Sequence, residues 1–148
     1  MKQKIPLKGL EDKRIVDATL YSHNDRWHLF FGDQKEAQTV LHLWTAPSLN
    51  EAFTPHPQSP ICLLPGSARM GGPIINIGHK IYRLGQNNEA GYGEALTIMS
   101  IEELTETKYV EKATGTIRID KVKGPHSLDI SSLNGKLLLD YYLSLIHI

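Results

Sequence analysis

Residues 69–92 hold several side chains that could bind an oxygen-rich ligand. Four of them can donate hydrogen bonds, and these are Arg69, Arg83, Gln86 and Tyr92. Arginine presents a planar fork of N–H groups that suits carboxylates, phosphates and vicinal oxygens. Glutamine both donates and accepts hydrogen bonds, as recognition of a sugar hydroxyl requires. The segment therefore predicts a ligand-binding site.

Two glycines in the same segment, Gly71 and Gly72, would let a ligand approach the backbone closely. The alternative interpretation of Arg69 and Arg83 is a structural ion pair, with Asp17 as one candidate partner. A buried arginine needs a carboxylate in either case, so the sequence leaves both interpretations open.

Two further polar residues, Asp17 and His126, open predicted strands and are candidate catalytic residues. A carboxylate flanked by the apolar pairs IV and AT would be partly desolvated, and it could bind sugar hydroxyls or an arginine. The alternative for Asp17 is a turn cap. A histidine at the start of a strand could shuttle a proton or bind a hydroxyl, and the alternative is an inward-facing histidine with no chemical role.

The elements that position these residues are predicted to be β-hairpins. Three segments share an extended apolar piece, a polar turn and a second strand rich in large apolar residues: Asp17 to Asp33, Gly72 to Asn87 and His126 to Tyr142. The turns read HNDR, IGHK and LNGK. Polar turn residues between such segments are the sequence signal of a hairpin.

The hairpins recur at a nearly constant interval. The residues that leave the three turns are Arg26, Lys80 and Lys136, which gives a period of about 55 residues. This period is typical of propeller blades, each a four-stranded antiparallel sheet. The missing strands are predicted in residues 39–47, near AFTPHP, in GEALTIMSIEEL and in YVEKATGTIRI. A one-turn helix is expected after a capping box formed by Ser100 and Glu103, with strand resuming at Tyr109.

The predicted fold is all-β, a partial five-bladed β-propeller with two full four-stranded blades and part of a third. A propeller normally closes with at least four blades, so the remaining blades of a larger protein are expected partners. We assign residues 1–13 to a polar N-terminal segment, 14–143 to the propeller fragment and 144–148 to a non-native tail.

Composition limits the function classes. The 16 Lys and Arg balance the 16 Asp and Glu, which gives no basic footprint for nucleic acid. No apolar run approaches the roughly 18 residues of a membrane span, and the charged N-terminus lacks a signal-peptide core. A soluble chain is expected, cytoplasmic by default. Cys62 lies in an apolar run and is predicted to be a buried thiol. Neither a metal site nor a cofactor is expected.

Five blocks of sequence carry a resemblance to a known family. They are RIVDATLYSHNDRWHLFFGD, HPQSPI, ARMGGPIINIGHKIYRLGQ, YGEALTIMSIEELTETKYVE and GPHSLDI. Together they resemble the N-terminal domain of glucosamine inositolphosphorylceramide transferases and, more distantly, the five-bladed propellers of family 43 and family 32 glycosidases. The transferase resemblance implies a carbohydrate-related propeller. It does not by itself imply a transferase active site, because in that family the glycosyl transfer is attributed to a separate C-terminal domain.

The glycosidase resemblance also implies roles for two positions. Asp17 matches the aspartate that tunes the catalytic carboxyls, and Gly71 stands where the general acid would lie in an E-G-P stretch. Glycine has no proton to give, which argues against ordinary hydrolysis. Glu89 or Glu94 could supply an acid, and the spacing selects neither. The preferred function is carbohydrate or glycoconjugate binding. The alternatives are an active glycosidase or glycosyl-transferring enzyme, and a non-catalytic scaffold.

Overall fold

The computed structural model describes residues 6–130 and 135–142, and in that part of the chain all regular structure is β. The strands are β1 (Ile15–His23), β2 (Arg26–Asp33), β3 (His42–Ala46), β4 (Thr54–Pro55), β5 (Ile75–Ile77), β6 (Lys80–Asn87), β7 (Ala95–Leu104), β8 (Tyr109–Ile117), β9 (Lys123–Ile130) and β10 (Leu137–Tyr142). No helix in the described ranges is long and apolar enough to cross a membrane.

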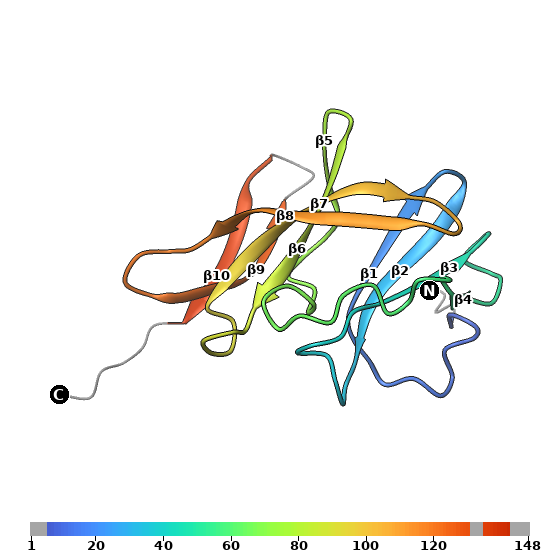
Figure 1. Ribbon diagram of the computed structural model, residues 1–148, viewed down its shortest axis with the longest axis horizontal. Helices are drawn as coiled ribbons and strands as arrows, with labels where there is room; N and C mark the ends of the chain where they lie inside the picture. The colour runs from blue at the N-terminus through green and yellow to red at the C-terminus, as the bar shows by residue number, and fades with distance from the viewer. Residues whose placement is uncertain (1–5, 131–134, 143–148) are drawn as a thin grey trace, which may run out of the picture.

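The described strands form three antiparallel sheets that follow one another along the chain (Figure 1). The first sheet has the order β1-β2-β3-β4, and the second repeats this arrangement as β5-β6-β7-β8. The third sheet contains β9 and β10. The prediction of an all-β fold is therefore confirmed, and within each sheet consecutive strands pair with one another.

Local turn chemistry explains the first two hairpins. In the first, His23 pairs with Arg26 across Asn24 and Asp25, whose φ angles are 50° and 56°. Asn and Asp tolerate this left-handed conformation better than most residues, so the turn can be two residues long. In the second, Ile77 pairs with Lys80, and Gly78 has a φ of 60°. Both predicted hairpins are confirmed.

The third hairpin also pairs as predicted, with Leu139 opposite Leu128. Its expected turn, LNGK, lies partly outside the described residues, and Gly135 has a φ of 66°. The additional strands predicted for the first two sheets correspond to β3, β4, β7 and β8.

The expected one-turn helix is wrong. Strand β7 continues through Ser100 and Glu103 to Leu104, and a tight turn then leads to Tyr109, where strand resumes as predicted. In that turn Thr105 donates its backbone N–H to the carbonyl of Lys108 at 2.9 Å. Strand β7 pairs on both sides, with β6 and β8, which satisfies its backbone groups and outweighs a weak capping preference.

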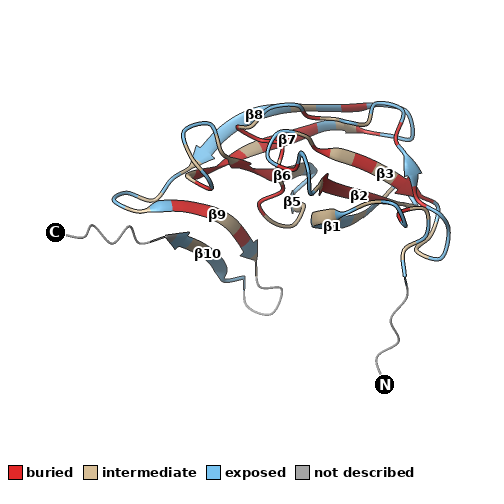
Figure 2. Ribbon diagram, turned by 90° about the horizontal axis from the view of Figure 1, so that it is seen from below, coloured by how far each residue is buried: buried red, intermediate tan, exposed pale blue. Residues whose placement is uncertain are grey.

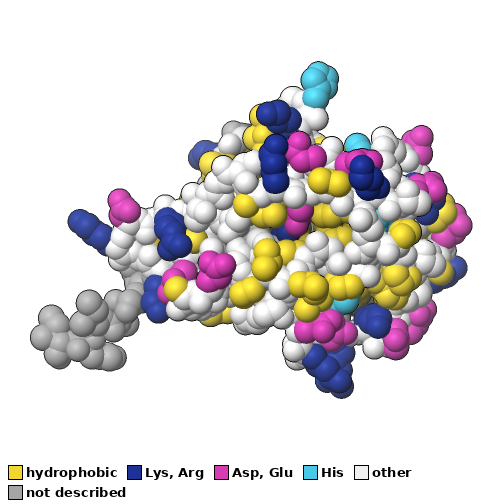
Figure 3. Space-filling model, viewed as in Figure 1, with side chains coloured by type: hydrophobic (Ala, Val, Ile, Leu, Met, Phe, Trp, Pro, Cys, Tyr) yellow, Lys and Arg dark blue, Asp and Glu magenta, His cyan; other side chains and the backbone are white. Residues whose placement is uncertain are grey.

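In the two four-stranded sheets the inner strands are more buried than the outer ones (Figure 2). Buried residues concentrate in β2, β6 and β7, whereas β8 is mostly exposed. Charged side chains of both signs are interspersed on the face seen in Figure 3, around apolar side chains near its centre. This face has no extended area of a single charge, in keeping with a formal net charge of zero.

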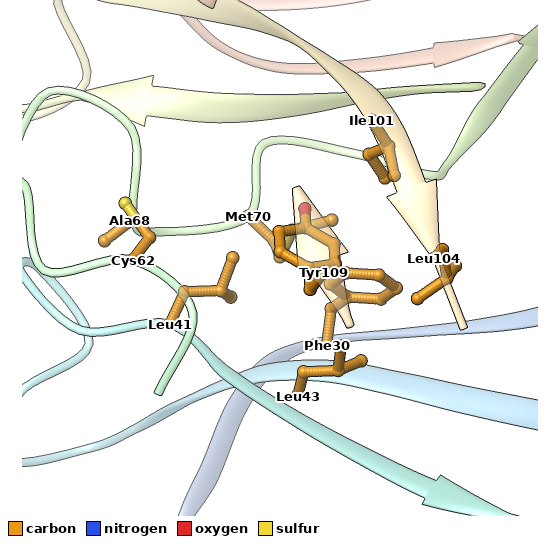
Figure 4. Close-up of a cluster of buried hydrophobic side chains, with 9 residues drawn as sticks. All are labelled: Phe30, Leu41, Leu43, Cys62, Ala68, Met70, Ile101, Leu104 and Tyr109. Atoms are coloured by element: carbon orange, nitrogen blue, oxygen red, sulfur yellow. The ribbon is translucent and has the colours of Figure 1, made fainter. Parts of the chain in front are cut away.

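Two apolar clusters hold the sheets together. The larger one joins the first sheet to the second and includes Phe30, Leu43, Met70 and Tyr109 (Figure 4). Cys62 lies in this cluster and is 8% exposed, which confirms the predicted burial of the thiol. A second cluster, built from Leu84, Leu96 and Leu128, joins the second sheet to the third. Each sheet therefore packs face to face on the next.

A third apolar cluster covers the other face of the first sheet. It contains Leu29, Phe31 and Phe53, and Leu10 from the N-terminal segment packs into it. The backbone N–H of Phe53 donates to the carbonyl of Lys8 at 2.9 Å. Part of the polar N-terminal segment is thus fixed to the first sheet.

Candidate functional site

A cavity of about 580 Å³ lies where the three sheets meet. Its walls come from the start of β1, the segment before β5, the end of β6, the loop that follows β6, and β9. Seven of the eight residues singled out from the sequence line it: Asp17, Arg69, Gly71, Gly72, Gln86, Tyr92 and His126. Residues that are distant in sequence therefore meet in one place.

An ion pair forms one wall of the cavity. Arg69 donates its Nε–H to Oδ2 of Asp17 at 2.5 Å, across the junction of the first and second sheets. Asp17 has a φ of 50° and lies where the register of β1 shifts between Val16 and Thr19. Such a bulge redirects a side chain from the sheet, which places the carboxylate at the junction. The side chains of Asp17 and Arg69 are 33% and 20% exposed, so both remain accessible.

Two rings stand beside this ion pair. The guanidinium carbon of Arg69 lies 5.4 Å from the centre of the Tyr92 ring, a cation–π distance. The Tyr92 and His126 rings are 5.8 Å apart, between centroids, and tilted by 43°. Tyr92 comes from the loop after β6, and His126 from β9. The rings give the cavity a partly apolar wall.

Asp140 holds His126 from the neighbouring strand. Oδ2 of Asp140 is 2.9 Å from Nδ1 of His126, and Oδ1 accepts the backbone N–H of Ser127 at 2.6 Å. Sequence reasoning missed Asp140. The hairpin could have predicted its position, because counting outward from the turn along both strands places Asp140 opposite Ser127.

The two glycines serve packing between the sheets. The backbone N–H of Leu128 donates to the carbonyl of Gly71 at 2.8 Å. A Cβ at residue 71 would lie 2.4 Å from Cδ2 of Leu96, and a Cβ at residue 72 would lie 2.1 Å from the carbonyl oxygen of Leu128. Gly72 also has a φ of 151°, which L side chains rarely adopt. The close backbone approach predicted at this pair is therefore made by β9.

Gln86 is 3% exposed and faces the cavity from the end of β6. Its Nε2 donates to the carbonyl of Met70 at 3.0 Å. Its Oε1 is buried and has no hydrogen-bond partner among the described residues. A buried acceptor without a partner is uncommon, and it marks a place where a donor would be stabilising.

Arg83 does not line the cavity, contrary to the expectation from the sequence. Its side chain is fully buried, where its Nε donates to Oε2 of Glu111 at 2.6 Å and its Nη1 to the carbonyl of Ser67 at 2.6 Å. Burial alone would lower the pKa of Arg83, but the carboxylate of Glu111 more than offsets it and the pKa is raised. The structural alternative applies here, with Glu111 as partner in place of Asp17.

The alternation of side chains along a strand could have predicted that Arg83 does not line the cavity. Successive side chains on a strand point to opposite faces, so residues 83 and 86 of β6 face different sides. Gln86 shares its face with Leu84, which packs toward the third sheet. Arg83 lies on the opposite face, beside Ser67 and Glu111.

Besides Asp17, the carboxylate that lines the cavity is not one of the substitute acids expected from the sequence. Neither Glu89 nor Glu94 lines it, whereas Asp129 does, a residue that sequence reasoning missed. Thr19, also missed, donates its hydroxyl to the carbonyl of Gly72 at 3.2 Å and ties β1 to the second sheet. In the described ranges, no three His, Cys, Asp or Glu side chains gather closely enough to hold a metal ion. The arrangement suits hydrogen bonding to a polar ligand.

Comparison with known proteins assigns the chain to a family. Residues 4–132 match the family model described as glucosamine inositolphosphorylceramide transferase 1, N-terminal. The chain belongs to this family. It is 32% identical over 110 residues to glucosamine inositolphosphorylceramide transferase 1 of Oryza sativa subsp. japonica, and 31% identical over 112 residues to that of Arabidopsis thaliana.

The aligned regions cover 70% of this chain but only 15% and 14% of these two relatives. The chain thus spans a small part of the length of the glucosamine inositolphosphorylceramide transferases that it matches. No solved structure matches it. The relationship places the chain in the context of glycan biosynthesis proteins.

Proposed function

We propose that the chain is part of a carbohydrate- or glycoconjugate-binding domain in a protein of glycan biosynthesis or modification. The observation that carries this proposal is the cavity to which three sheets contribute Asp17, Arg69, Gln86, Tyr92 and His126. A carboxylate that accepts, a guanidinium that donates and flanking rings are the groups that sugar recognition uses. Membership of a glycosyltransferase-associated family supports the same proposal.

The fold proposed for this domain is a five-bladed β-propeller, of which the chain supplies two blades and part of a third. Two features support it: the first two sheets repeat one strand order, and residues near the start of β1, just before β5 and in the middle of β9 line a common cavity. The remaining blades would come from further polypeptide, as the greater length of the relatives allows.

In this proposal, ligand binding does not depend on a general acid at residue 71. A carboxylic side chain there would begin with a Cβ only 2.4 Å from Cδ2 of Leu96. Leu96 is fully buried, so little space is available for it to move. Recognition therefore rests on Asp17 and Arg69, with Tyr92 and His126 as the neighbouring wall.

A glycan array followed by calorimetric titration of the best ligand tests the proposal. We expect the 148-residue chain to bind a glycan and Arg69→Met to weaken that binding by about tenfold, the loss of one or two charge-assisted hydrogen bonds. Arg26→Met is the matched control, because Arg26 pairs with Glu106 at 3.2 Å and does not line the cavity. Absence of any bound glycan, or equal losses in the two variants, would contradict the proposal.

A further inference from the structure

The described side chains that line the cavity carry more negative than positive charge. Among the described residues that line it, Arg69 is the one Lys or Arg, whereas Asp17 and Asp129 are both carboxylates. The Nε–H of Arg69 is already bound to Asp17. An incoming anion would therefore meet a cation whose charge is largely compensated.

The other hydrogen-bond donors of the wall do not change this balance. His126 lies 2.9 Å from the carboxylate of Asp140, so a positive charge on its ring would also be countered. Nε2 of Gln86 is bound to the carbonyl of Met70, and its Oε1 is an acceptor that favours an incoming donor. The polar wall thus offers mainly hydrogen-bond acceptors, which an anion cannot use because it is itself an acceptor.

We infer that the cavity binds an uncharged vicinal diol and discriminates against the anionic counterpart of the same sugar. This inference rests on the proposed function and names its ligand class. Each hydroxyl of a diol donates and accepts, so one can donate to Asp17 while the next accepts from Arg69. A uronate carboxylate only accepts at neutral pH, and inorganic phosphate carries about one to two negative charges; either anion would lie beside Asp17 and Asp129. Charged groups of a larger glycoconjugate lie outside the cavity.

Titration of matched sugars tests the discrimination. The probes are methyl α-D-glucoside and methyl α-D-galactoside, each compared with its uronate and with inorganic phosphate. We expect the neutral glycoside to bind at least about tenfold tighter than its uronate. Equal or tighter binding of the uronate overturns the inference and leaves the proposed function intact. If neither the neutral sugars nor the uronates bind although the array shows a bound glycan, the inference fails and the proposed function stands; if the array shows no bound glycan either, both fail.

Removing the Asp17 carboxylate should invert the preference. In Asp17→Ala the guanidinium of Arg69 loses its partner, so binding of phosphate and uronate should rise about tenfold while the neutral glycoside weakens. Asp17→Asn, which keeps the side-chain size, should shift the preference in the same direction and guards against misfolding of the alanine variant. Glu106→Ala removes one negative charge away from the cavity and should change neither affinity. Unchanged anion binding in both Asp17 variants would contradict the inference.

Discussion

Replacing Glu111 by alanine is expected to lower the free energy of unfolding by about 3–5 kcal/mol, because the change leaves a buried charge without a partner. Arg83 is 0% exposed, and the side chain of Glu111 is 9% exposed. Glu111 accepts from both Nε and Nη2 of Arg83 and from the hydroxyl of Tyr109 at 2.6 Å. The guanidinium is itself fully buried, so truncating its partner leaves a charge that is poorly hydrated.

Urea unfolding followed by circular dichroism measures this effect. The matched control is Glu106→Ala, which breaks the pair with Arg26, where the carboxylate side chain is 70% exposed. An exposed pair of this kind contributes about 0–1 kcal/mol. Where Glu111→Ala is too unstable to purify, Glu111→Gln keeps the shape and one acceptor and should show a smaller loss in the same direction.

A double variant separates charge from packing. Arg83→Met with Glu111→Leu removes both charges, and it should be more stable than Glu111→Ala alone, because no uncompensated charge remains. The reasoning is refuted if Glu111→Ala loses no more stability than Glu106→Ala. It is also refuted if the double variant is less stable than the single one.

Two further predictions concern stability. Gly72→Ala should destabilise by more than about 2 kcal/mol because its Cβ would meet the carbonyl of Leu128, whereas Gly78→Ala, with a φ of 60° and open space, should cost about 1 kcal/mol; similar urea midpoints for the two would contradict this. Burial lowers the pKa of His28 from 6.5 to about 4, so the folded state favours the neutral ring. The contribution of this ring to the free energy of unfolding is fully present above pH 6.5 and is lost as the pH falls toward 4. The free energy of unfolding, measured between pH 4 and 7, should show this fall, and His28→Gln should reduce its dependence on pH.

The hairpins could be predicted because their information is local. Asn24, Asp25 and Gly78 occupy positions that need positive φ, and each sits between two extended apolar segments. Turn length then fixes the register, so His23 had to face Arg26 once the turn was recognised. Sheet order followed from the same signals, because consecutive antiparallel strands usually pair.

The composition of the cavity was predicted less completely because it depends on which face each side chain takes. Asp17 and His126 were predicted to open strands; β1 and β9 begin earlier, at Ile15 and Lys123, but both residues line the cavity. The bulge at Asp17 and the pairing of Asp140 with Ser127 arise from the register across strands, which single-strand patterns do not contain. The helix expected after Ser100 failed for a related reason, since pairing on both edges of β7 overrides local propensity.

The two arginine pairs show how burial separates structure from function in this chain. Arg69 and Arg83 bind carboxylates through the same Nε geometry, at 2.5 and 2.6 Å. Arg83 is closed on every side and can only stabilise the fold, whereas Arg69 and Asp17 stay partly exposed at the cavity. Partial exposure makes the Asp17–Arg69 pair weak as a stabilising contact and available for exchange with ligand hydroxyls. Loss of Arg69 should therefore change ligand affinity with little effect on unfolding, the reverse of the effect expected for Glu111.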